Sequence, residues 1–423
     1  MKTGVAAAEL PTPDSVAVDG KNRPKGISTR LGIAITYPFP LGEPSGGSRM
    51  TREIARHLGK LGADVTILPV STNGLDRGFP RSRPDAKFLG IEFDADLAQD
   101  SVGIVRVPQN PLYFQLDGLS VKKAVANLIK QRKLDIVLSY FHEGAFLPSY
   151  LRSQNVKFGY IATWITYERM ARNRPWNIRG FLQNLKNDRL IVKPYQQADI
   201  ICATSHHTRG QLVEIVGVDE SRVVVCYLGV DPAFTEIPRT RPKEITHFLF
   251  FGRIVPAKGF IDALQAVGQL AAKGINNWIF RMVGEGKHEW AKRVAREHGI
   301  ADKVLVCDAV DDRGLRNELE QAHLAIMPSH REAFGLTFAE AQAAGVPVVA
   351  YEAGSVPEVI QNGMTGWLAP LGDVHGLAQC IEKAIEDPQV TYHMGLAARE
   401  RIKRMFTWEK TAATILEAIQ ALM

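Results

Sequence analysis

The sequence predicts an α/β protein with two doubly wound parallel-sheet domains that face a cleft. Apolar strand-like runs alternate with amphipathic helical stretches along both halves of the 423-residue chain. This alternation is typical of parallel sheets with helices on both faces. It is interrupted once, by the three prolines of the stretch 228–245, which we expect to link the domains. A chain of this length has room for two or three domains.

The first half opens with a strand–loop–helix–strand unit. The apolar run 31–40 ends in prolines and is followed by the Gly-rich turn 41–50. In 51–62 the apolar residues recur at helical spacing, and 63–70 is again apolar, which predicts a βαβ unit. Further along, we expect a helix at 121–133 and strands at 134–141, 157–165, 198–205 and 222–229.

The same alternation restarts after the linker. We expect strands at 246–254, 278–284, 303–310, 324–329 and 346–351, and helices at 262–274, 290–299, 315–322 and 336–345. In doubly wound sheets, ligands bind at the carboxyl ends of the strands. The cleft between two such domains is therefore the expected site.

Composition excludes several classes of protein. No apolar run reaches the ~18 residues that a membrane span needs. The apolar patch in the first ten residues is too short for a secretory signal. Residues 1–28 are rich in Pro, Ser, Asp, Lys and Gly without periodicity, and we expect a disordered tail there. The four cysteines have neither metal-site nor redox spacing, which favours buried thiols and a cytoplasmic protein.

The stretch 331–340, REAFGLTFAE, joins an expected strand to an expected helix. Glu332 falls in the loop and Glu340 in the first turns of the helix. The amides of Phe334, Gly335 and Leu336 then lie at a helix N-terminus, where an anion is stabilised. The alternative is an ordinary helix start flanked by two solvated glutamates.

Two cations follow the first strand of the second domain. Arg253 and Lys258 lie in FFGRIVPAKGF, on the same expected rim of the sheet. An arginine offers a fork to phosphate and a lysine a mobile charge. Together with a helix N-terminus they suit a diphosphate leaving group. The alternative is a pair of solvated loop cations.

With these motifs the chain resembles the retaining nucleotide-sugar glycosyltransferases of family 4, which have the GT-B fold. RIVPAKG looks like the family's R-x4-K-G motif and EAFGLTFAE like its E-x7-E motif, with Ala333 where the family usually has glycine. The segments MVGEGKHEW, GVPVVAYEAGSVPEVIQNGMTGWL and FTWEKTAATILEAI also resemble the family. The resemblance covers most of 245–420 and is thinner in the first half, where GGSRM, ADIICATS and LGVD carry it.

The resemblance implies a role for each matching residue. Arg253, Lys258 and Glu332 would be the catalytic set: the two cations would hold the donor diphosphate, and Glu332 the hydroxyls of the donor sugar. Glu340 would bind the ribose hydroxyls of the nucleotide. The remaining donor-binding positions would be Gly46, Gly47, Gly284, Val310, Ala333, Phe334, Gly335 and Leu336.

It also implies the domain organisation and the chemistry. Residues 29–235 would form a Rossmann-like acceptor-side domain, 236–405 the donor domain, and 406–423 a helix that crosses back to the first domain. The leaving phosphate would accept the acceptor's proton on the same face. No metal or other cofactor is expected, because Arg253, Lys258 and the helix dipole replace a cation.

The acceptor side departs from the family pattern. Family members often carry a histidine at the end of a first-domain strand, where this chain has Tyr140, followed by His142 and Glu143. A second family histidine corresponds to Ile165. His142 and Glu143 are the acceptor-side candidates; the alternative is a loop-end histidine with no role.

The net charge of +6 comes entirely from the first half. The stretch 152–193 holds nine basic and two acidic residues, interleaved with Trp164, Tyr167, Trp176 and Phe181. Such a segment suits an anionic membrane surface and a lipid-linked glycan acceptor. The alternatives are a solvated basic face and a soluble small-molecule acceptor. We expect no nucleic-acid partner.

Two other classes of function compete with a transferase. A dinucleotide-dependent oxidoreductase would need G-x-G-x-x-G after the first strand, which PLGEPSGGSRM does not match. A non-catalytic sugar-nucleotide-binding protein would keep the same binding residues, and only a turnover assay separates it from an enzyme.

Overall fold

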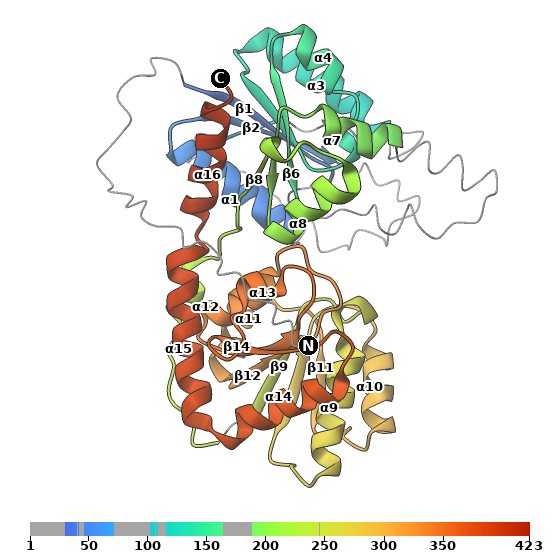
Figure 1. Ribbon diagram of the computed structural model, residues 1–423, viewed down its shortest axis with the longest axis vertical. Coiled ribbons are helices and arrows are strands. Elements are labelled where there is room, and N and C mark those ends of the chain that lie inside the picture. The colour runs from blue at the N-terminus through green and yellow to red at the C-terminus, as the bar shows by residue number, and fades with distance from the viewer. Residues whose placement is uncertain are drawn as a thin grey trace, which may run out of the picture. The chain divides into compact units, whose positions relative to one another are not determined.

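The computed structural model contains two sheets in which every strand pair is parallel (Figure 1). It describes residues 30–39, 41, 46–71, 102–105, 107–108, 116–163, 188–244 and 246–423. Residues 31–423 form one unit. The predicted α/β class with two Rossmann-like sheets is confirmed, whereas the boundaries given above for the domains stay a prediction.

The first sheet has the strand order β3-β2-β1-β5-β6-β7-β8, with β4 paired to β2. Its strands are β1 (Gly32–Tyr37), β2 (Asp64–Ser71), β3 (Val102–Ile104), β4 (Val107–Pro108), β5 (Ile136–Ser139), β6 (Lys157–Ala162), β7 (Ile200–Ala203) and β8 (Val223–Val225). The α-helices described in this half are α1 (Gly46–Lys60), α3 (Asp117–Gln131), α4 (Pro148–Ser153), α7 (Lys193–Gln197) and α8 (His206–Gln211).

The second sheet has the order β11-β10-β9-β12-β13-β14. Its strands are β9 (His247–Phe251), β10 (Ile279–Val283), β11 (Val304–Cys307), β12 (Leu324–Ile326), β13 (Val348–Tyr351) and β14 (Gly366–Ala369). Its helices are α9 (Phe260–Ala272), α10 (His288–Glu297), α11 (Asp312–Gln321), α12 (Leu336–Ala343), α13 (Val356–Val359), α14 (Val374–Glu386) and α15 (Pro388–Met405).

Several strands are fully buried, as expected where helices cover both faces of a parallel sheet. All six residues of β1 are buried, as are all of β12 and β13. Helix α1 turns Met50, Ile54 and Leu58 inward at helical spacing. The apolar runs in the sequence therefore become the core, while the residues that end each strand become the rim.

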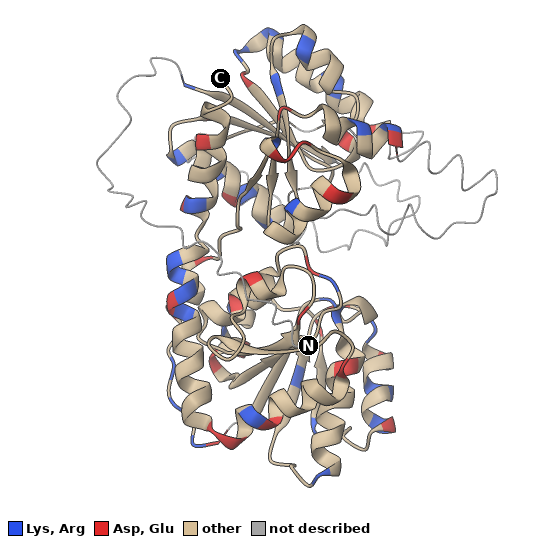
Figure 2. Cartoon of the chain, in the orientation of Figure 1, with Lys and Arg blue, Asp and Glu red and all other residues tan. Residues whose placement is uncertain are grey.

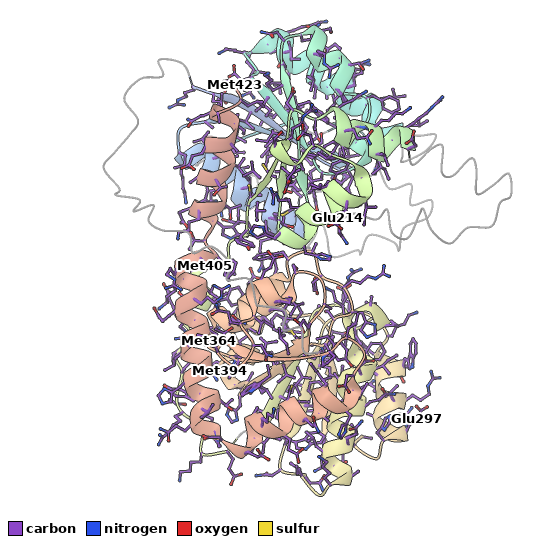
Figure 3. The ribbon with its side chains drawn as sticks, viewed as in Figure 1. Glu214, Glu297, Met364, Met394, Met405 and Met423 are labelled. Atoms are coloured by element: carbon purple, nitrogen blue, oxygen red, sulfur yellow. The ribbon has the colours of Figure 1, made fainter. Side chains whose placement is uncertain are left out.

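A final helix, α16 (Trp408–Gln420), follows α15 and packs against α1. Thr407 begins it by accepting a hydrogen bond from the amide of Lys410, an N-cap. The Thr411 hydroxyl donates to the carbonyl of Tyr227 at 2.7 Å, and His57 Nε2 lies 3.2 Å from Glu409 Oε1. Figure 3 labels Met394 and Met405 on α15 and Met423 after α16.

The strand orders place the predicted site residues at two switch points. The order of the first sheet reverses between β1 and β5, and that of the second between β9 and β12. Loops at a switch point diverge and leave a crevice for ligands. The residues that follow these four strands are Gly46 and Gly47 after β1, His142 and Glu143 after β5, Arg253 and Lys258 after β9, and Glu332 to Leu336 after β12.

Three strands were not singled out from the sequence, namely β3, β4 and β14. Two expected features lie outside the described residues: the tail 1–28, and most of the basic stretch, including Ile165, Trp164, Tyr167, Trp176 and Phe181. None of the described helices has the length and apolar character needed to cross a membrane.

Candidate active site

Two loops of the second sheet meet through an ion pair. Lys258 ends a 3-10 turn after β9, and its ammonium group pairs with the carboxylate of Glu332 in the loop after β12. The loops also share a backbone hydrogen bond, from the amide of His330 to the carbonyl of Ala257 at 3.0 Å. Gly259 has φ +73°, and a Cβ there would lie 1.8 Å from the carbonyl oxygen of Pro328. Only glycine permits this approach.

The loop of Glu332 is also held by hydroxyl groups from the first sheet. The Ser205 hydroxyl, after β7, donates to the Ala333 carbonyl at 2.7 Å, and Thr208 and Thr204 lie at 3.4 and 3.5 Å from it. On the other side, Ser355 donates to the Glu332 carbonyl through its amide and its hydroxyl, both at 3.2 Å. The carboxylate therefore sits on a fixed backbone.

Helix α12 begins directly after this loop. Gly335 precedes it with φ +93°, and a Cβ there would lie 2.4 Å from Cδ2 of Phe338, so glycine is required. No side chain caps the helix, which leaves first-turn amides available to an anion. Ala333 does not have positive φ, so alanine replaces the family's glycine without backbone strain. Phe334 is buried.

Glu340 lies on α12 and is 7% exposed. Its Oε1 accepts a hydrogen bond of 2.7 Å from Arg49 Nη1 on α1, and the same guanidinium pairs with Asp312 of α11. Burial raises the pKa of Glu340 to about 7, although Arg49 acts in the opposite direction. Sequence reasoning missed Arg49, whose only signal was its place two residues after the Gly46–Gly47 turn.

The other predicted donor-binding residues lie around these two loops. Arg253 is exposed, and no ion pair links its side chain to any residue that the structure describes. The neighbouring Ile254 amide donates to the carbonyl of Glu285 at 2.6 Å, which brings the buried Gly284 beside this loop. Val310 is 43% exposed at the start of α11. Figure 2 shows both signs of charge on the helices around the sheet.

Gly46 and Gly47 form the first turn of α1. A Cβ on Gly46 would lie 3.3 Å from Cδ1 of Leu336, so this turn lies next to the N-terminus of α12. A Cβ on Gly47 would lie 2.8 Å from the hydroxyl of Tyr37. The structure thus brings the predicted first-domain glycines to the predicted diphosphate-binding turn.

The acceptor-side candidates His142 and Glu143 lie directly after β5. Glu143 is fully buried in the structure. It accepts hydrogen bonds from the amides of Tyr140 at 2.6 Å and Phe141 at 3.0 Å, and from the Thr36 hydroxyl at 3.3 Å. Burial raises its pKa to about 7. Glu143 therefore ties the end of β5 to β1, and His142, which is partly exposed, begins the turn above it.

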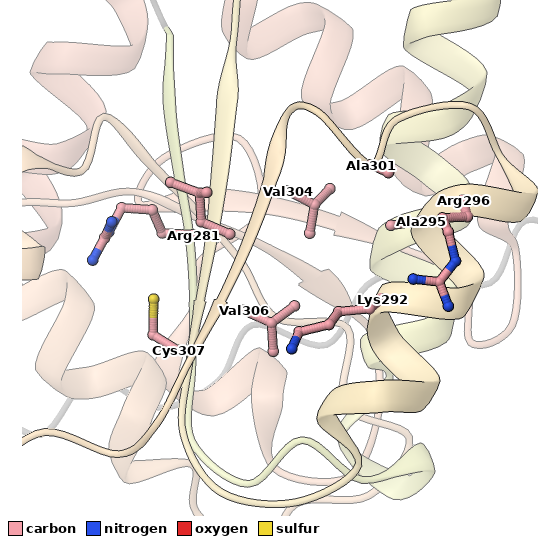
Figure 4. Close-up of a pocket in the computed structure, with 9 residues that line it drawn as sticks. Arg281, Lys292, Ala295, Arg296, Ala301, Val304, Val306 and Cys307 are labelled. Carbon is pink, nitrogen blue, oxygen red and sulfur yellow. The ribbon is translucent and has the colours of Figure 1, made fainter.

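A cavity of about 440 Å³ lies elsewhere, between β10, β11 and α10 (Figure 4). Its cations are Arg281, Lys292 and Arg296. Arg281 is already paired in bidentate fashion with Glu318, both contacts measuring 2.6 Å. None of the predicted site residues lines this cavity.

Comparisons with known proteins agree with the fold. The model of Glycosyltransferase Family 4 matches residues 44–234, and the model of Glycosyl transferases group 1 matches residues 235–401. Glycogen synthase of Mycobacterium tuberculosis is 30% identical over 231 residues, 53% of this chain and 55% of the relative. D-inositol 3-phosphate glycosyltransferase of Streptomyces scabiei is 31% identical over 244 residues, which cover 53% of this chain and 54% of the relative. These matches span about half the length of the curated relatives.

A longer match has lower identity. N-acetyl-alpha-D-glucosaminyl L-malate synthase of Bacillus anthracis is 24% identical over 393 residues, 90% of this chain and 94% of the relative.

Solved structures share the fold. Sucrose-phosphate synthase of Thermosynechococcus elongatus aligns with a TM-score of 0.73 at 19% identity, over 93% of this chain and 99% of that one. HepE of Anabaena, in complex with UDP and glucose, aligns with a TM-score of 0.68 at 18% identity, over 93% of this chain and 100% of HepE. Since two consecutive glycosyltransferase models match residues 44–401, the chain belongs to the glycosyltransferases with the GT-B fold.

Proposed function

We propose that this protein transfers a sugar from a nucleotide-diphosphate-sugar donor to a hydroxyl acceptor, with retention of configuration. The observation that supports this most is the pairing of Lys258 with Glu332 beside the uncapped start of α12. A cation, a carboxylate and free amides then meet at the switch point of the second sheet. The related fold of HepE, solved with UDP and glucose, supports the donor class.

Each group has a distinct task in this proposal. Arg253, Lys258 and the first-turn amides of α12 stabilise the diphosphate as negative charge develops on it. Glu332 accepts hydrogen bonds from the donor sugar, and Glu340 from the ribose. The leaving phosphate takes the proton of the attacking hydroxyl on the same face. We expect no metal ion to be needed, because the two cations and the helix carry that charge.

The pair of Lys258 and Glu332 has to rearrange when donor binds. In the structure each group satisfies the other, and Glu332 is only 9% exposed. A diphosphate offers Lys258 a stronger partner than one carboxylate, while the sugar hydroxyls offer Glu332 donors to replace the ammonium. Lys258 and Glu332 are therefore in place before the donor binds, and each exchanges the other for a group of the donor.

We further propose a lipid-linked glycan as acceptor, with peripheral attachment of a cytoplasmic protein to an anionic membrane. The basic and aromatic residues of 152–193 support this. A soluble sugar, cyclitol or secondary metabolite is the competing acceptor. The names of the relatives given above indicate different acceptors. The comparisons therefore do not distinguish a lipid-linked glycan from a soluble acceptor.

The experiment is a two-step assay on the full chain. Thermal-shift measurements with UDP, GDP, ADP and their hexose derivatives identify the donor, because a ligand that binds only the folded chain raises the melting temperature. Release of nucleoside diphosphate from that donor is then followed with candidate acceptors, and the anomer of the product is read by NMR. We expect release that depends on acceptor, and a retained anomer. Binding without turnover for every acceptor class would instead indicate a sugar-nucleotide-binding protein.

A further inference from the structure

Arg49 is the first-domain side chain that makes an ion pair with the predicted ribose-binding carboxylate. It follows the Gly46–Gly47 turn on α1, and its side chain is only 25% exposed. One of its nitrogens bonds Glu340 Oε1 at 2.7 Å, and the other pairs with Asp312, which lies two residues after Val310. The guanidinium is therefore fixed from two helices, α11 and α12, next to the expected nucleotide.

The contact with Arg49 affects the protonation state of the buried Glu340 carboxylate. The side chain of Glu340 is 10% exposed, and Arg49 is the one ion-pair partner it has among the described residues. A carboxylate taken out of water is protonated unless a cation or hydrogen bonds stabilise its charge. A protonated carboxyl keeps fewer lone pairs for hydroxyl donors than a carboxylate does. Arg49 uses one nitrogen on one oxygen, which leaves the carboxylate room to accept ribose hydroxyls.

Other charged groups near Glu340 do not replace Arg49. Asp312 and Asp231 are both anionic and act against its ionisation. Charged or titratable groups on the elements packed against α12 have other partners. Arg399 of α15 donates to the Ala344 carbonyl and Arg401 of α15 to the Glu358 carbonyl. Glu358 of α13 accepts from the amides of His206 and His207, and Tyr351 of β13 donates to Asp262. Arg52 lies one turn further along α1, where burial lowers the pKa of its guanidinium to about 10.

We propose that Arg49 is a positioning residue of the donor site, which favours the charged form of the Glu340 carboxylate and aims it at the ribose hydroxyls. This rests on the proposed function, since it takes Glu340 as the ribose-binding group. The pKa of Glu340, about 7 with Arg49 present, gives the inference a measurable consequence. Affinity for the donor falls as pH drops through this value, because Glu340 then gains a proton. Without Arg49 the same fall begins at higher pH.

The experiment measures the dissociation constant of the donor by calorimetry between pH 5.5 and 8.5. The probe is UDP-glucose, or the sugar nucleotide that gives the largest thermal shift, because its doubly esterified diphosphate does not titrate in this range. Arg49→Met should weaken binding about 10-fold or more near pH 6.5 and by less at pH 8.5, since one lost charged hydrogen bond is worth roughly 1.5–3 kcal/mol. Arg49→Lys should recover part of the affinity. Lys60→Met, which removes an exposed cation from the last turn of α1, is the matched control.

A double variant separates this role from a structural one. In the Glu340→Gln background, Arg49→Met should change affinity less than about twofold, and the pH dependence due to Glu340 should be gone. Full additivity of the two changes, or tighter binding by Arg49→Met, would overturn the inference. If Glu340→Gln alone leaves affinity unchanged, the assignment of the ribose site fails instead. Melting temperatures of all variants report any loss of fold.

Discussion

The ammonium group of Lys258 pairs with the carboxylate of Glu332, 74 residues further along the chain. The two residues end loops that leave adjacent strands, β9 and β12, at the point where the strand order of the second sheet reverses. The proposed donor site is thus assembled by topology, and its chemistry can be tested one side chain at a time.

Lys258→Ala and Arg253→Ala should each lower turnover at saturating donor by about 10²- to 10³-fold, the usual cost of removing one electrostatic stabiliser of the leaving group. The fold should survive, because Arg253 is exposed and Lys258 lies in a surface turn. Steady-state kinetics and circular dichroism check both points. Lys273→Ala is the control, since this lysine also pairs with a glutamate, Glu382, at 2.7 Å. Wild-type turnover in either site variant contradicts the diphosphate assignment.

Glu332 and Glu340 should bind different parts of the donor, the sugar and the ribose respectively. Glu340→Ala should weaken binding of the nucleoside diphosphate and of the full donor alike, because both carry the ribose. Glu332→Ala should weaken the full donor by roughly 1.5–3 kcal/mol and leave the nucleoside diphosphate little changed. Calorimetry with the two ligands measures this. Equal losses for both ligands in both variants are incompatible with separate roles.

The hydroxyl of Ser205 should matter for turnover although it belongs to the first sheet. Ser205→Ala removes its 2.7 Å hydrogen bond to the Ala333 carbonyl, which stabilises the loop of Glu332 by about 1 kcal/mol. It also removes the N-cap of α8, where the Ser205 hydroxyl accepts from the Thr208 amide. We expect a lower melting temperature and reduced turnover. Ser221→Ala is the matched control, because Ser221 donates only to the nearby, exposed Asp219. Identical behaviour of the two variants would show that the Ala333 contact does not position the loop.

Glu143 should make stability depend on pH near neutrality. Its pKa is about 7 in the folded chain and near the ordinary 4.5 when unfolded. Between these values the folded chain binds a proton that the unfolded chain has lost, so the free energy of unfolding falls as pH rises. Glu143→Gln should make this decline shallower in denaturant titrations from pH 5 to 8. The exposed Glu214, labelled in Figure 3, supplies the control Glu214→Gln. A slope that is unchanged in Glu143→Gln means that Glu143 is charged throughout.

Membrane attachment should depend on salt. Liposomes with anionic lipid should sediment the protein at low ionic strength and release it at high ionic strength, whereas neutral liposomes should not bind it. Changing Arg169, Arg172 and Arg174 to glutamate should abolish binding, and the melting temperature of this variant reports any loss of fold. Absence of binding to anionic vesicles at low salt would remove the membrane proposal and favour a soluble acceptor.

The sequence predicted every strand of the second sheet except β14, and the signal was clearest for β12 and β13, which are fully buried. Runs such as Val348–Tyr351 are continuous and apolar, and the flanking glycines mark their ends. Strands β3 and β4, with three and two residues, are too short to show a periodicity. These residues are strands because they pair with β2, and this pairing is not visible in their own sequence.

The site was predictable where residues follow a strand closely, and not where distant helices meet. Arg253, Lys258 and Glu332 each lie within a short loop whose place on the sheet follows from the alternation. The contact of Arg49 with Glu340 joins residues 291 positions apart and depends on how α1 lies beside α12. The contact of Glu143 with the Thr36 hydroxyl is of the same kind, because Thr36 lies on β1 and comes next to Glu143 only when β5 pairs with β1.

The packing of α16 on α1 has a consequence for synthesis of the chain on the ribosome. The surface of α1 that α16 covers is translated well before Trp408 and the residues after it. At 5–20 residues per second, roughly 20 to 70 seconds separate the two helices. During that interval the covered face of α1 lacks its partner helix. Synthesis of α16, rather than completion of β8, is then the event that lets α1 bury this face.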